Sequence, residues 1–62
     1  MPFVSVKILE GHSIERKRKM VEEITESVAR IAELPEDYVQ VVFEEFAKHN
    51  WGANKKLLCD ED

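Results

Sequence analysis

The chain has 62 residues, which is enough for one small domain spanning residues 1–62, and it carries 13 acidic against 9 basic side chains. This acidic balance argues against nucleic acid as the main partner. No apolar run approaches the ~18 residues of a membrane-spanning helix, so we expect no membrane partner. The start has no signal-peptide pattern and Cys59 is the single cysteine. We therefore expect a cytoplasmic protein without an internal disulfide.

The small size of the chain predicts an oligomer. A monomer of this length buries only about 60% of its unfolded surface and needs a disulfide, a metal or a partner to be stable. His12 and His49 stand far apart and belong to no cluster with metal-ligand spacing, so we expect no metal. Several copies sharing one core remain as the source of stability.

The first predicted element is a strand over residues 3–9, FVSVKIL, whose residues alternate with a period of two. Gly11 permits a turn, and Ser13 is a candidate helix N-cap. From Ile14 the apolar residues recur at helical spacing, and the helix should stop near Leu34 because a proline follows. The basic run ERKRK at 15–19 indicates a solvated helix face; it has no interleaved aromatic residues for nucleic-acid stacking.

A second strand is predicted over residues 39–46, VQVVFEEF, after a turn at Pro35. The long connection through a helix makes the two strands parallel, so the subunit is a β-α-β unit of the α/β (α+β) class. Residues 50–52 suggest another turn, and residues 56–59 suggest a short C-terminal strand or hairpin, with pairing to another subunit. One helix cannot cover both faces of the sheet, so the second face should meet another copy.

Pro2 raises a question of its own. One interpretation is structural: Pro2 is the first residue of the strand, where its missing amide hydrogen is harmless. The other is chemical, because removal of Met1 would leave Pro2 with a free secondary amine that can act as a base or nucleophile. The adjacent carboxylates Glu44 and Glu45 do not form an acid–base pair, since neighbouring strand residues point to opposite faces.

Taken together, the stretch MPFVSVKILEG, Pro35, the VxVVFEE strand and the K-H-N-W-G segment resemble the 4-oxalocrotonate tautomerase family along essentially the whole chain. The resemblance implies β-α-β subunits assembled as a homohexamer, a trimer of dimers. It also implies removal of Met1 and catalysis by Pro2, which shuttles a proton in the enol–keto tautomerisation of a small 2-hydroxy or 2-oxo acid. No cofactor is implied.

The resemblance also implies a substrate-binding set: Leu9 and Trp51 as apolar walls, and His12 and Gln40 at positions where the family usually has arginines. Trp51 has an alternative role as an interface anchor, and His12 as an exposed turn residue. Histidine is partly charged near neutral pH and glutamine is uncharged, so Pro2 should be more basic than in relatives with both arginines. We expect poor use of dicarboxylates and a preference for monoanionic, phenylpyruvate-type enols.

Two functions stay open at this point. The first is a cofactor-free tautomerase, with Pro2 as its base. The second is a catalytically weak or inactive member of the family that keeps the oligomeric fold as a binding or scaffold protein. His12 and Gln40 favour the second function, whereas Pro2 and its apolar neighbours favour the first. Arg30 and Lys48 of neighbouring chains are candidate replacements for the missing cations.

Overall fold

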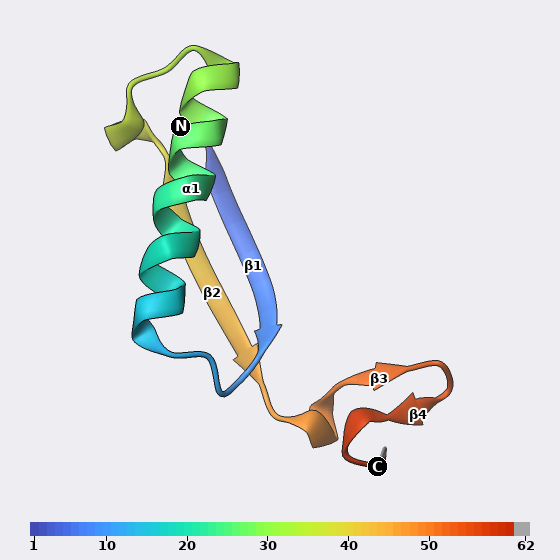
Figure 1. Ribbon diagram of the computed structural model, residues 1–62. Coiled ribbons are helices and arrows are strands. Elements are labelled where there is room, and N and C mark those ends of the chain that lie inside the picture. The colour runs from blue at the N-terminus through green and yellow to red at the C-terminus, as the bar shows by residue number, and fades with distance from the viewer. Residues whose placement is uncertain (61–62) are drawn as a thin grey trace.

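The computed structural model describes residues 1–60, which form a β-α-β unit followed by a small hairpin (Figure 1). Strand β1 spans Phe3–Leu9, helix α1 spans Ile14–Ala32 and strand β2 spans Gln40–Phe46. The strands β1 and β2 are parallel neighbours in one sheet. The predicted β-α-β subunit with parallel strands is therefore confirmed.

Alternation along the strands decides which side chains α1 covers. Val4, Val6 and Ile8 of β1 are half-buried, and α1 lies along the sheet (Figure 1). The intervening Phe3, Ser5 and Lys7 are exposed on the opposite, uncovered face. Parallel pairing places equivalent residues of the two strands on the same side, so the sheet has one covered face and one open face.

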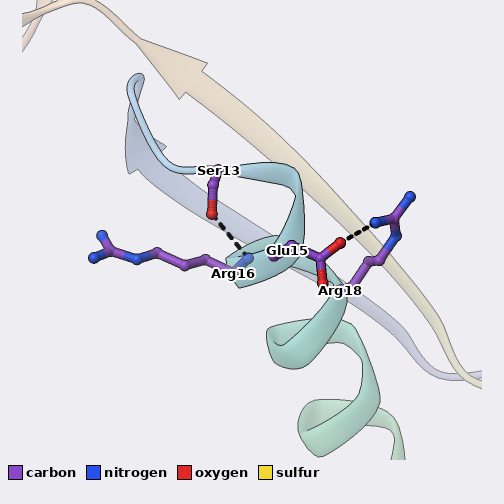
Figure 2. Close-up of polar contacts among 4 residues, drawn as sticks. All are labelled: Ser13, Glu15, Arg16 and Arg18. Carbon is purple, nitrogen blue, oxygen red and sulfur yellow. Dashed lines mark hydrogen bonds and ion pairs between the residues drawn. The ribbon is translucent and has the colours of Figure 1, made fainter.

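The start of α1 follows the sequence prediction. The Ser13 Oγ accepts a hydrogen bond from the Arg16 N–H at 3.1 Å, which satisfies one of the free amides of the first turn (Figure 2). Because the residue at this position is Arg16 and not a glutamate, the reciprocal half of a capping box is missing. Figure 2 also shows an ion pair between Glu15 and Arg18, and both side chains are well exposed.

The end of α1 differs from the prediction by two residues. The helix ends at Ala32, and Glu33 adopts a left-handed conformation with φ 58° and ψ 51°. The Leu34 N–H then donates to the Ala29 carbonyl at 3.0 Å. This left-handed cap turns the chain before Pro35, so the helix stops earlier than the proline alone requires.

A short 3₁₀ turn at Glu36–Tyr38 precedes β2 and moves the start of the strand by one residue. The Val39 N–H is used in that turn, where it donates to the Glu36 carbonyl at 3.1 Å. The first ladder bond of β2 therefore comes from Gln40, whose N–H donates to the Pro2 carbonyl at 3.1 Å.

The C-terminal segment corrects two predictions. Strand β3 (Gly52–Ala53) pairs antiparallel with strand β4 (Lys56–Leu57), and Asn54 and Lys55 between them both have positive φ. The turn predicted at residues 50–52 lies two residues earlier, as a 3₁₀ turn over Lys48–Asn50, and Gly52 already belongs to β3. A second turn follows at Asn54 and Lys55, where positive φ at two successive residues is what a two-residue hairpin requires. The strand predicted at 56–59 is shorter and pairs with β3 of its own chain; Leu58–Asp60 is a 3₁₀ turn.

The isolated chain has almost no core. Among residues 1–60 only Ala29 is buried, with 5% of its surface exposed. The radius of gyration is 14.7 Å, against about 11 Å for a compact domain of this length. Phe3, Ile14 and Ile31 are all more than half exposed.

No helix within residues 1–60 combines the length and the apolar character that crossing a bilayer requires.

Candidate active site

Pro2 lies directly before β1 and is half-buried, whereas Met1 is 81% exposed. The Pro2 carbonyl accepts the hydrogen bond from Gln40, so the backbone of Pro2 is anchored to the neighbouring strand. The nitrogen of Pro2 carries no hydrogen, and no ladder hydrogen bond needs one at this position. Removal of Met1 would cost little packing and would expose an amine at a fixed place.

Gln40 is the predicted substrate-binding residue that lies nearest to Pro2 in the chain's own fold. Gln40 stands opposite Phe3 in the register of the parallel strands, and its side chain is exposed. Pro2, Phe3 and Gln40 therefore gather at the amino-terminal end of the sheet.

Leu9 and Trp51 gather at the other end of the sheet. Leu9 stands opposite Phe46 in the register, and the rings of Phe46 and Trp51 meet edge to face with centroids 5.9 Å apart and planes inclined by 70°. His12 is exposed in the loop between β1 and α1. The Glu10 N–H donates to the Phe46 carbonyl at 2.9 Å, which extends the ladder towards this loop.

The two groups of site residues are separated by the length of β1. Seven residues of strand span about 20 Å, so the chain does not bring Leu9, His12 or Trp51 to Pro2. The two predicted apolar walls, Leu9 and Trp51, thus lie at the far end of the sheet, and the apolar residue next to Pro2 within one chain is Phe3. A site that contains all of them requires two or more copies.

Glu44 and Glu45 point to opposite faces, as predicted. The Glu44 Oε1 accepts a hydrogen bond from the Ser5 Oγ at 3.0 Å on the open face. The Glu45 Oε2 lies 2.7 Å from the Lys17 Nζ and ties β2 to α1. Each carboxylate thus has a structural partner. No three His, Cys, Asp or Glu side chains within residues 1–60 are grouped so that they could hold a metal ion.

A sequence model described as a tautomerase enzyme matches residues 2–60 of the chain. The chain belongs to the tautomerase family. A probable tautomerase from Halalkalibacterium halodurans is 43% identical over 61 residues, which cover 98% of this chain and all of the relative. The 2-hydroxymuconate tautomerase of Bacillus subtilis is 40% identical over 60 residues, with 97% of each chain covered.

Solved structures confirm the resemblance to 4-oxalocrotonate tautomerase. The crystal structure of YwhB, a homologue of that enzyme, superposes with a TM-score of 0.93 at 38% identity and covers 98% of this chain and all of its own. A heterohexameric 4-oxalocrotonate tautomerase from Chloroflexus aurantiacus has a TM-score of 0.94 at 19% identity, with full coverage of both chains, and shows the shared fold. The family predicted from the sequence motifs is therefore confirmed.

The structure has one feature near Trp51 that the sequence patterns did not indicate. An open hollow of about 210 Å³ lies beside the Trp51 ring. We call it the Trp51 hollow; it is lined by Lys7, Phe46, Asn50, Trp51 and Gly52. Lys7 shares the open face of β1 with Leu9, two residues away. This period-two relation is the sequence signal that could have identified Lys7 as a neighbour of the predicted wall residue Leu9.

Proposed function

We propose that the chain is a cofactor-free tautomerase that interconverts the enol and keto forms of 2-hydroxy and 2-oxo acids, with Pro2 as the general base after removal of Met1. The observation that carries this proposal is the position of Pro2 in a chain that belongs to the tautomerase family. Pro2 is half-buried, and its carbonyl is held by the Gln40 N–H at 3.1 Å. A base anchored in this way is oriented before the substrate arrives.

The proton balance of the proposed reaction is simple. The Pro2 amine takes the proton of the 2-hydroxyl group, the oxygen electrons form the carbonyl, and the conjugated double bonds shift. The protonated amine then delivers the same proton to C3 of a simple enol, or to the far end of the conjugated system in a dienol, and regenerates the base. A negative enolate or dienolate develops between the two transfers, so hydrogen-bond donors or cations near its oxygen lower the barrier. Partial burial of the amine disfavours its protonated form and keeps it available as a base.

The proposed site is completed by other copies of the chain. Pro2 and Gln40 are at one end of the sheet and Leu9, His12 and Trp51 are at the other. We propose a homo-oligomer, a hexamer built as a trimer of dimers, in which Pro2 of one copy meets Trp51 of another. The exposed apolar surface supports the assembly: α1 has a hollow of about 300 Å³ lined by Ser27, Val28, Ile31 and Ala32.

The proposed substrates are small monoanionic enols. His12 and Gln40 bring no permanent charge to the places where the family usually has arginines, so a second carboxylate on the substrate gains little. The 2-hydroxymuconate tautomerases of B. subtilis and Pseudomonas putida, at 40% and 35% identity, are named for a dicarboxylate. We therefore expect this chain to differ from them in substrate preference.

The cytoplasmic location that the sequence suggests stays a prediction.

An activity panel on methionine-free protein tests the proposal. Intact mass first establishes that Met1 is absent, and a set of enol acids is then assayed with wild type and Pro2→Ala. Loss of a general base lowers the rate by about 10²- to 10⁴-fold, so Pro2→Ala should fall in this range while keeping the oligomer. An unchanged rate in Pro2→Ala, or retention of Met1 in protein from its native cell, would overturn the catalytic role. The scaffold function would then be favoured, because His12 and Gln40 already weaken anion binding.

A further inference from the structure

We propose that Lys7 provides the cation that binds the substrate carboxylate in this tautomerase, and that the Trp51 hollow holds the aromatic part of the same substrate. This inference rests on the proposed function and deepens it. It assigns a specificity role to a residue on the open face of β1, and it names the substrate class as an aromatic monocarboxylate.

Lys7 has no acidic partner among the described residues of its own chain. Lys7 is exposed on the open face and stands opposite Glu44 in the strand register. The Glu44 Oε1 accepts the hydrogen bond of Ser5 at 3.0 Å. Within residues 1–60 no carboxylate oxygen lies within 4.0 Å of the Lys7 ammonium, whereas Lys17 and Arg18 both have acidic partners.

The rest of the lining fits an aromatic anion. Phe46 and Trp51 both line the hollow, and aromatic rings favour offset or edge-to-face packing with another flat ring. Asn50 adds an amide that can donate and accept hydrogen bonds, and no carboxylate belongs to the lining. One cation, two aromatic rings and one amide therefore line an open hollow of about 210 Å³.

The position of the hollow supports this role. Trp51 and Leu9 are the apolar walls of the proposed active site, and Lys7 lies on the same strand face as Leu9. His12 and Gln40 leave the site without a permanent positive charge, although the reaction passes through an anion. A lysine ammonium on this face gives the anion a partner, but as a point charge it lacks the two-pronged geometry that selects dicarboxylates.

Trp51 is the single tryptophan of the chain, so its fluorescence reports on the hollow directly. We would titrate the assembled wild-type protein with 3-phenylpropanoate and with 3-phenylpropanamide, its uncharged analogue. The same titrations use Lys7→Met, Lys7→Gln and Lys7→Arg. The matched control is Lys19→Met, which removes the same charge from an exposed position on α1.

An exposed ion pair contributes little, so the expected loss is modest. Lys7→Met and Lys7→Gln should weaken binding of the carboxylate about three- to fivefold and leave the amide unchanged, while Lys7→Arg and Lys19→Met should match wild type. The inference is overturned if the carboxylate binds equally well to both neutral Lys7 variants. It is also overturned if both probes weaken together, or if Lys19→Met produces the same loss. Activity of Pro2→Ala, measured in parallel, judges the proposed function separately, because probe binding needs no turnover.

Discussion

Pro2 and Trp51 lie at opposite ends of the β1–β2 sheet, separated by a strand of seven residues or about 20 Å. The carbonyl of Pro2 is hydrogen-bonded to Gln40 at the start of β2, and Trp51 packs against Phe46 at the end of the same strand. A single chain therefore contains two halves of the proposed site. In the proposed site, chemistry and assembly are therefore linked, because the two halves can meet only between copies.

Subunit mixing should reveal this division of the site. Pro2→Ala and Trp51→Leu homo-oligomers should each be weakly active, and oligomers reassembled from an equal mixture should exceed the mean activity of the two parents. The gain arises because a Trp51→Leu subunit can provide Pro2 to a neighbour that still has Trp51. Steady-state rates before and after denaturation and joint refolding measure the effect.

The control for this experiment is each variant refolded alone, with its oligomeric state checked by sedimentation. If the mixed oligomers show only the mean of the parental rates although the subunits have exchanged, Pro2 and Trp51 do not act in one shared site.

Gln40→Arg should improve turnover of 2-hydroxymuconate. Gln40 is exposed opposite Phe3, one strand away from Pro2, so an arginine there would place a guanidinium group near the base. A charged hydrogen bond contributes on the order of 2 kcal/mol, and we expect kcat/KM to rise about ten- to hundredfold. Gln40→Met is the matched control without charge and should give no rise. An unchanged kcat/KM in Gln40→Arg would mean that the missing charge is not what limits dicarboxylates.

The ion pair of Lys17 and Glu45 should stabilise the packing of α1 on the sheet. The two charged atoms are 2.7 Å apart, and the side chains are 25% and 36% exposed. A double-mutant cycle with Lys17→Met and Glu45→Gln should give a coupling free energy of roughly 0.5–1 kcal/mol that shrinks in high salt. Urea unfolding at fixed protein concentration measures the four stabilities.

The Glu15–Arg18 pair provides the comparison, because its side chains are 69–80% exposed and both belong to α1. Its coupling should be about 0.3–0.5 kcal/mol or less. Equal couplings for the two pairs would show that Lys17 and Glu45 add nothing through their position between the helix and the strand.

Local patterns in the sequence predicted the elements well, for reasons that lie in the backbone. Alternating apolar residues over 3–9 can bury one face only as a strand, and the Ser13 hydroxyl caps the helix that follows it. The errors came at the ends of elements, where a local turn or cap redirects a backbone amide. Val39 donates to the 3₁₀ turn and leaves the strand to begin at Gln40, and Glu33 caps α1 before Pro35 can end it.

By itself, the sequence determined the β-α-β order, the parallel pairing and the family, because these follow from periodicity, connection length and motifs along the chain. Only the tertiary structure decided which site residues are neighbours. A strand carries its two ends about 20 Å apart, so Leu9 and Trp51 cannot reach Pro2 of the same chain. The place of Lys7 beside Trp51 likewise depends on a contact between segments distant in sequence, which no local pattern records.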